Sequence, residues 1–301
     1  LSKEDEKMLN DSAIKLIKEL KIEGGCNVQF ALNPHTSEYY LIEVNPRVSR
    51  SSALASKASG YPIARVTAKI AVGMALEDIQ IANTNAAFEP KLDYVIAKLP
   101  RFPFDKFASA TNKLGTQMKA TGEIMGIGSN LEEALLKGIR SLEIGANHMY
   151  LSKFDNMSVD ELLEYISEFR SDNIFAIAEL IYHGVSIEKI HEITMITPYF
   201  LEAIKNIIDM EETLRVNKDG ETLVAAKKMG FSDKYIARLW KCDELDVYNM
   251  RKEMNLFPAF KMVDTCHTNA YIPYFYSSYT GENASRLTDK KKIFVLGAGP
   301  I

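Results

Sequence analysis

Length, composition and charge exclude several classes of protein. The chain has 301 residues, of which 47% are hydrophobic and 25% charged, and its formal net charge is −4. This length is enough for two domains that each have a core. No apolar run approaches the roughly 18–20 residues that a membrane span needs. A slightly acidic balance argues against broad binding to nucleic acids or anionic membranes.

The cysteines indicate a reducing compartment. Cys26, Cys242 and Cys266 are scattered, and no pair has the Cys-x-x-Cys spacing. Reduced thiols of a cytoplasmic protein are therefore the better interpretation than disulfides or zinc ligands. The chain begins with Leu1 and shows no signal-peptide pattern.

The first half of the chain mixes helices with strands. Apolar residues at helical spacing predict a helix over residues 4–20 with one buried face. Strands are expected over residues 26–32, 40–45, 93–99 and 123–127, and helices over residues 51–58, 62–73 and 131–142. Asn130 is the expected N-cap of the last of these helices.

The second half reads as mostly helical. Helices are predicted over residues 158–170, 174–183, 187–193, 198–215, 220–228, 232–239 and 244–254, with strands over 260–263 and 271–276. The periodic signal lapses near residues 147–156, so we expect the domain boundary there. Residues 291–301 read as a strand that runs into a Gly-rich turn. The predicted fold class is an α+β part followed by a mostly α-helical domain.

The predicted hairpin of the first half carries the clearest chemical signal. If it folds symmetrically about Thr36, Gln29 lies opposite Glu43 and Asn27 lies opposite Asn45. Because strand side chains alternate, Glu43 and Asn45 share one face, while Ile42 and Val44 are expected to point into a core.

This polar face suits a metal ion. Carboxylate and amide oxygens are ligands for Mg²⁺, which shares its remaining positions with phosphate and water. Arg47 and Arg50 follow the second strand and could grip an anion by fork geometry. The alternative interpretation is a half-solvated hairpin whose polar face only meets water.

The sequence also resembles a known family. The matching segments are residues 24–31, 43–58, 88–90, 100–102, 117–123, 140–146, 263–266 and 295–300. They closely resemble the large subunit of carbamoyl phosphate synthetase, and the Asn-Pro-Arg-Val-Ser-Arg-Ser-Ser run at residues 45–52 is the most specific of them. The resemblance runs through nearly the whole chain in order.

The resemblance implies a domain plan. Residues 1–147 would be the C-terminal portion of the first, carboxyphosphate-forming ATP-grasp domain, and residues 148–290 a helical oligomerisation domain. Residues 291–301 would begin a second synthetic half. On this interpretation the chain is an internal segment of a longer enzyme and has no synthetase activity alone.

The resemblance also implies a reaction. The parent enzyme would make carbamoyl phosphate from bicarbonate, ammonia and two ATP, for arginine and pyrimidine biosynthesis. A separate glutaminase small subunit would supply the ammonia from glutamine, and the helical domain would carry self-association. Two Mg²⁺ or Mn²⁺ ions would accompany ATP in each active site.

Site residues follow from the same match. Gln29, Glu43 and Asn45 would ligate the metal ions, and Gln29 and Glu43 would thereby contact the cofactor. Arg47 would hold bicarbonate or carboxyphosphate, with Arg50 beside it. Glu123 aligns with a glutamate that lines the internal passage of the family; the alternative for this residue is a strand carboxylate paired with a nearby lysine.

Three rival functions remain open at this point. Another ATP-grasp ligase, similar to biotin carboxylase, would share the Glu-x-Asn strand but should lack the long helical part. A pure assembly module would use only the helices. Residues 220–254 also look like a helix-turn-helix DNA binder, but seven basic against six acidic side chains make a poor phosphate footprint.

Overall fold

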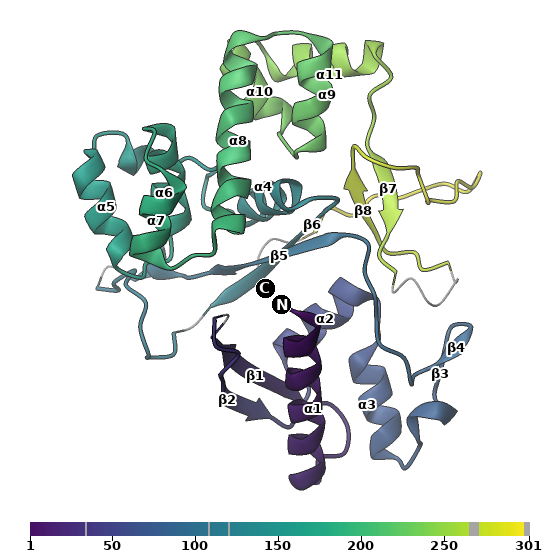
Figure 1. The fold of residues 1–301 in the computed structure, drawn as a ribbon. Helices are drawn as coiled ribbons and strands as arrows, with labels where there is room; N and C mark the ends of the chain where they lie inside the picture. The colour runs from purple at the N-terminus through teal and green to yellow at the C-terminus, as the bar shows by residue number, and fades with distance from the viewer. Residues whose placement is uncertain (34, 108, 120, 265–270, 298–301) are drawn as a thin grey trace. The chain divides into compact units, whose positions relative to one another are not determined.

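The computed structural model describes residues 1–33, 35–107, 109–119, 121–264 and 271–297. The chain divides into two compact units, Leu1–Leu92 with Val263–Pro273 and Asp93–Met262 with Tyr274–Ile301 (Figure 1). The two units differ in which residues pack together, and such a division does not locate the boundaries of family domains. The predicted boundaries at residues 147 and 290 therefore stay predictions. Cys266 and residues 298–301 of the predicted Gly-rich turn lie outside the described residues.

The first unit holds the predicted hairpin. Its elements are α1 (Lys3–Glu19), β1 (Asn27–Leu32), β2 (Tyr39–Asn45), α2 (Arg50–Ser59), α3 (Ile63–Ala71), the 3₁₀ turn η1 (Leu76–Asp78), β3 (Gln80–Ile81) and β4 (Thr84–Asn85). β1 pairs antiparallel with β2, and β3 with β4. Helix α1 begins where the Ser2 side chain accepts a hydrogen bond from the Asp5 N–H at 3.0 Å.

The predicted buried face of α1 is only half-buried. No residue of α1 is buried, and Ile14 and Leu20 are 52% and 56% exposed. The buried cluster of this unit consists of Val66, Ile79, Ile81 and Ala86, which belong to α3 and the segment that follows it. Helical periodicity therefore predicted the helix correctly but not what covers it.

The hairpin has the predicted pairing next to its polar face. Gln29 lies opposite Glu43, and Asn27 lies opposite Asn45. A bulge then shifts the register, because Phe30 pairs with Leu41 and leaves Ile42 without a partner. Ile42 is 60% exposed, so the expectation that it points into a core is wrong.

The second unit combines one strand pair, a helical bundle and a second hairpin. Its elements are β5 (Val95–Arg101), η2 (Phe104–Lys106), β6 (Gly122–Gly128), α4 (Leu131–Ser141), η3 (Ser152–Phe154), α5 (Val159–Ser167), α6 (Asn173–Tyr182), α7 (Ile187–Thr194), α8 (Pro198–Val216), α9 (Gly220–Lys228), α10 (Asp233–Trp240), α11 (Glu244–Glu253), β7 (Ala259–Met262) and β8 (Phe275–Ser278). The predicted fold class, strands with helices followed by a helical region, is confirmed.

Helix α8 organises the bundle. It contacts α6 and α7 on one side and α9 and α10 on the other (Figure 1). The core around it includes Leu201, Ile207 and Leu214, each with no exposed surface. No helix of the described residues is long and apolar enough to cross a membrane.

Glycines let α4 lie directly on β6. A Cβ atom at Gly126 would stand 2.1 Å from the carbonyl oxygen of Ala134, and one at Gly128 would stand 2.8 Å from the Ala134 nitrogen. A side chain at Gly126 would therefore push the helix off the strand. The N-terminus of α4 is where the sequence predicted it, since the Asn130 side chain accepts a hydrogen bond from the Glu133 N–H at 2.8 Å.

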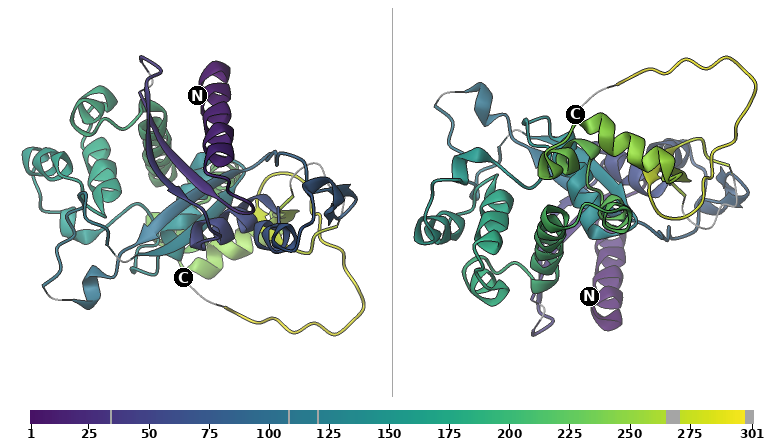
Figure 2. Two further views of the ribbon diagram at one scale, coloured as in Figure 1. Left: turned by 90° about the horizontal axis from the view of Figure 1, so that it is seen from below. Right: turned by 90° about the horizontal axis from the view of Figure 1, so that it is seen from above.

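The strand predicted from residue 291 is not formed. Residues 291–297 are irregular, and Ile293 and Phe294 are 91% and 86% exposed (Figure 2). A strand needs a neighbour to accept its backbone hydrogen bonds, and no described segment pairs with this one. The assignment of these residues to a further domain stays a prediction.

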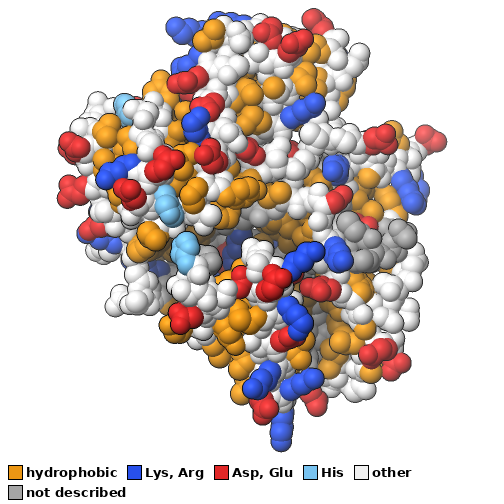
Figure 3. Space-filling model, in the orientation of Figure 1, with side chains coloured by type: hydrophobic (Ala, Val, Ile, Leu, Met, Phe, Trp, Pro, Cys, Tyr) orange, Lys and Arg blue, Asp and Glu red, His pale blue; other side chains and the backbone are white. Residues whose placement is uncertain are grey.

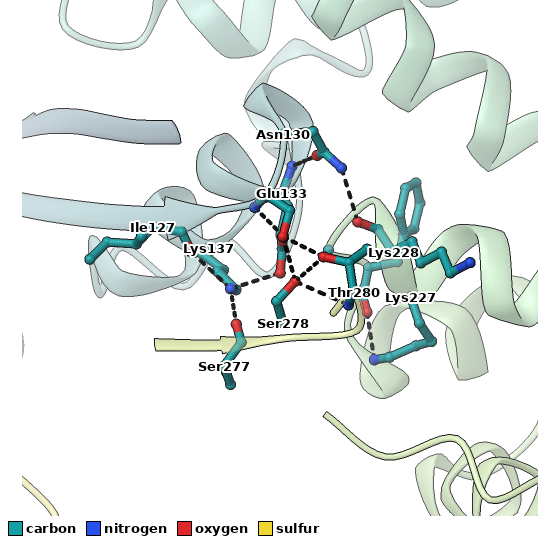
Figure 4. A network of polar contacts seen from close by, with 12 residues as sticks. Ile127, Asn130, Glu133, Lys137, Lys227, Lys228, Ser277, Ser278 and Thr280 are labelled. Atoms are coloured by element: carbon teal, nitrogen blue, oxygen red, sulfur yellow. Dashed lines mark hydrogen bonds and ion pairs between the residues drawn. The ribbon is translucent and has the colours of Figure 1, made fainter. Parts of the chain in front are cut away.

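A buried carboxylate joins three segments of the second unit (Figure 4). Glu133 is 1% exposed and accepts hydrogen bonds from the Ser129 N–H at 2.7 Å and from the Ser278 hydroxyl at 3.0 Å. Its other oxygen lies 2.8 Å from Nζ of Lys137. The Lys137 ammonium also donates to the carbonyls of Ile127 in β6 and Ser277 in β8. Lys137 therefore links two strands that belong to different sheets.

We expect Glu133→Gln to destabilise the second unit by about 1–3 kcal/mol, because the substitution leaves the part-buried Lys137 ammonium without its countercharge. Urea unfolding followed by circular dichroism measures the effect. Glu132→Gln, in the same turn of α4, is the control because an amide still accepts the 2.9 Å hydrogen bond from Asn206. Equal stability of the two variants would contradict the assigned role of Glu133.

A second buried polar pair lies in the helical core. His148 is 2% exposed, stacks on the Tyr235 ring at 3.8 Å between centroids, and has Nε2 3.5 Å from Oε2 of Glu211. Burial lowers the pKa of His148 below 6.5, although Glu211 opposes that shift. Burial alone would raise the pKa of Glu211, but the nearby side chains of His148, Tyr235 and Arg215 outweigh it and lower that pKa.

These shifts predict a loss of stability in acid. Below pH 6.5 the unfolded His148 binds a proton that the folded imidazole resists, so the free energy of unfolding falls with pH. Between about pH 7.5 and about pH 5.5 we expect His148 to account for up to about 1.4 kcal/mol of that loss.

Urea unfolding at both pH values tests this prediction. His148→Gln should lose less stability on acidification than the unsubstituted protein, whereas His183→Gln, at a half-exposed position, should lose as much. If His148→Gln keeps the full pH dependence, the titrating group lies elsewhere.

Candidate metal centre on the β-hairpin

The paired ends of β1 and β2 bring three polar side chains together. Gln29 and Glu43 are direct cross-strand partners, and Asn45 is two residues beyond Glu43 on the same face. Gln29 and Glu43 are exposed and Asn45 is half-buried. This face of the hairpin can therefore receive a ligand from solvent.

Both amides converge on one carboxylate oxygen. Nε2 of Gln29 and Nδ2 of Asn45 each donate to Oε1 of Glu43 at 2.9 Å. Nε2 of Gln29 also donates to Oδ1 of Asn27 at 3.2 Å. The sequence predicted that Asn27 lies opposite Asn45, but it did not predict the contact between Asn27 and Gln29. These two residues are two positions apart on one strand, so their side chains share a face, and this spacing could have indicated the contact.

The three side chains fit a hard divalent cation. A half-turn of either terminal amide exchanges its NH₂ group and its oxygen, and both ends have nearly the same shape. After that exchange, two amide oxygens and a carboxylate oxygen meet at one point. Mg²⁺ and Mn²⁺ bind such oxygens and leave other positions to water and phosphate.

No set of three His, Cys, Asp or Glu side chains could hold a metal ion in the part of the chain that the structure describes. A metal centre on the hairpin would thus depend on its amides as much as on its single carboxylate. Sites of that kind bind weakly alone and gain affinity when a phosphate supplies further oxygens.

The two predicted arginines follow β2 directly. Arg47 is in the turn after Asn45, where its N–H donates to the Asn45 carbonyl at 2.9 Å, and Arg50 is the first residue of α2. The hydroxyl of Ser52 accepts a hydrogen bond from the Ser49 N–H at 3.2 Å, which begins the helix. Both arginines are exposed, next to a helix N-terminus that attracts anions.

Glu123 belongs to the second unit and has a different environment. It is opposite Pro100 in the β5–β6 pair, and its Oε1 lies 3.0 Å from Nζ of Lys98. Its Oε2 is buried and has no hydrogen-bond partner among the described residues. The lysine pairing that the sequence left open is therefore present, and a role in an internal passage stays a prediction.

Comparison with family models gives two matches. Residues 1–79 match the model described as carbamoyl-phosphate synthase L chain, ATP binding domain. Residues 123–255 match the model described as carbamoyl-phosphate synthetase large chain, oligomerisation domain. The first match contains the whole hairpin centre with Arg47 and Arg50, and the second contains helices α4–α11, including those that resembled a helix-turn-helix.

Proposed function

Because the chain belongs to the carbamoyl-phosphate synthetase large-chain family, with an ATP-binding part and an oligomerisation domain, we propose that its hairpin serves the ATP-dependent activation of bicarbonate. Gln29, Glu43 and Asn45 would hold one or two Mg²⁺ or Mn²⁺ ions. The observation that carries this proposal is the convergence of both amides on one oxygen of Glu43.

The chemistry assigned to each residue follows from charge. Bound divalent ions would draw negative charge from the β- and γ-phosphates of ATP. Glu43 supplies the anionic ligand, while the amides of Gln29 and Asn45 add donors without adding charge. Arg47 would hold the bicarbonate or carboxyphosphate anion through paired N–H donors, with Arg50 beside it.

The wider assignments are part of the same proposal. The complete enzyme would form carbamoyl phosphate from bicarbonate, ammonia and two ATP, receive ammonia from a glutaminase subunit, and serve arginine and pyrimidine biosynthesis in the cytoplasm. Glu123 would line the passage that the intermediate follows. These 301 residues alone would make no carbamoyl phosphate.

We expect Glu43→Gln to weaken Mn²⁺ binding by the chain at least about tenfold, because the substitution removes the only carboxylate of the centre. Water-proton relaxation or electron paramagnetic resonance titration measures free Mn²⁺. Glu38→Gln is the matched control, since it makes the same change in the exposed turn of the hairpin. Equal Mn²⁺ affinity in both variants would show that Glu43 is not a ligand of the metal ion.

In the enzyme of full length, Glu43→Gln should also abolish bicarbonate-dependent ATP cleavage, while Glu38→Gln should leave it unchanged. Near-normal turnover of Glu43→Gln would contradict the assigned function even if Mn²⁺ binding were lost.

The oligomerisation domain supports self-association of the chain. We propose that the surface around the α7–α8 junction takes part in it. Met195, Tyr199 and Phe200 are close in sequence and are 72%, 66% and 49% exposed. The rings of Tyr199 and Phe200 pack edge to face at 5.4 Å between centroids, so this exposed aromatic group is a candidate contact. The face of the molecule in Figure 3 mixes charges of both signs with apolar side chains.

Replacing both Tyr199 and Phe200 by Ser should raise the dissociation constant of the self-associated form by at least about tenfold, as expected for loss of aromatic contacts. Light scattering over a dilution series measures it. Val216→Ser is the control, since Val216 is 81% exposed at the other end of α8. An unchanged constant in the double variant would place the contact elsewhere.

A further inference from the structure

A cavity lies in the helical unit, apart from the hairpin centre and from the proposed association surface at the α7–α8 junction. It has a volume of about 370 Å³ and is bounded by the loop after α4 and by α10. Lys234, Tyr235 and Arg238 come from α10, where their spacing puts them on one side of the helix, and His148 and Tyr150 come from the loop. Lys234 and Arg238 are exposed, so the cavity opens to solvent.

The two cations of this cavity differ from others in the same unit. Lys137, Arg215, Lys227 and Arg251 each have a carboxylate oxygen within 3 Å. In the described part of the chain, no carboxylate forms an ion pair with Lys234 or Arg238. The guanidinium of Arg238 instead lies over the Tyr150 ring, 4.7 Å from its centroid. Stacking holds the group in place and leaves N–H donors for a ligand.

A buried imidazole adds an independent observation. Neither ring nitrogen of His148 has a hydrogen-bond partner among the described residues, although the side chain is 2% exposed. The ring packs against those of Tyr235 and Phe231, at 3.8 Å and 4.8 Å between centroids. A buried polar atom without a partner costs free energy, and the N–H of a neutral imidazole can donate to a ligand oxygen.

We propose that this cavity binds a small molecule with an oxyanion group, a phosphate or a carboxylate. Arg238 and Lys234 would contact the anion, and the rings of Tyr150 and Tyr235 would line the space beside it. The volume is in the range of small-molecule sites. The proposal does not depend on the hairpin centre, which belongs to the other compact unit.

Isothermal titration calorimetry provides the readout. The chain is titrated with inorganic phosphate, pyrophosphate and succinate at constant ionic strength, with sodium chloride as the blank. Trp240, the single tryptophan of the sequence, lies on α10 but on another side of the helix from Arg238, so its fluorescence is only a second, indirect signal.

Saturable binding of at least one of these anions is expected, and the order of affinities tells phosphate from carboxylate recognition. Arg238→Ala should weaken it at least about tenfold and Lys234→Ala by less, since a guanidinium can make two parallel hydrogen bonds. Lys252→Ala, a charge removal at an exposed position of α11, should leave affinity unchanged.

Two results would overturn the proposal. One is no saturable response to any of the three anions above the chloride blank. The other is binding that Arg238→Ala and Lys234→Ala leave intact. Circular dichroism of each variant shows whether it is folded. If Arg238→Ala does not fold, Lys234→Ala, at an exposed position, still tests the proposal.

Discussion

The second unit depends on one buried carboxylate. Glu133 accepts from a backbone N–H that precedes its own helix and from a hydroxyl of β8, residues that are 149 positions apart in sequence. Burying a charge is costly unless every oxygen has a partner, and here each one does. The turn before α10 packs on the same residue, because a Cβ atom at Gly230 would stand 2.8 Å from Cα of Glu133. The strand pair, the bundle and the last hairpin therefore meet at this side chain.

The polar centre on the hairpin has the opposite character. Its donors and acceptors also converge, but they do so on an exposed face of a two-stranded ribbon. Hydrogen bonds between exposed amides and a carboxylate add little to stability because water competes for the same groups. Polar groups that converge but add little to the stability of the fold suit a ligand site, because a ligand can replace their mutual hydrogen bonds at low cost in free energy. By the same reasoning, Arg238 and Lys234, which form no ion pair with a carboxylate of the described residues, suit a ligand site better than the cations of the bundle that do form one.

The sequence predicted most of what local rules decide. Helix α9 begins and ends where expected, Asn130 caps α4, and the pairing of Gln29 with Glu43 followed from the symmetry of the turn. The prediction missed what distant contacts decide. The bulge at Ile42 breaks the alternation, the apolar face of α1 is only half-buried, and residues 291–297 pair with no strand of the described residues. His148 and Glu211 are too far apart in sequence for any spacing rule to join them.

The two compact units have buried clusters of different size, and this difference suits the different functions proposed for them. Among the described residues, the buried cluster of the first unit contains four side chains, whereas that of the second extends from Leu136 to Val247. A small core tolerates movement and exposes polar groups, which suits the capture of a metal–nucleotide whose binding then adds stability to the bound form. A large core fixes helix positions, which suits a surface that must match another copy of itself. The proposed metal centre and the proposed association surface thus fall in the units whose packing suits metal binding and self-association, respectively.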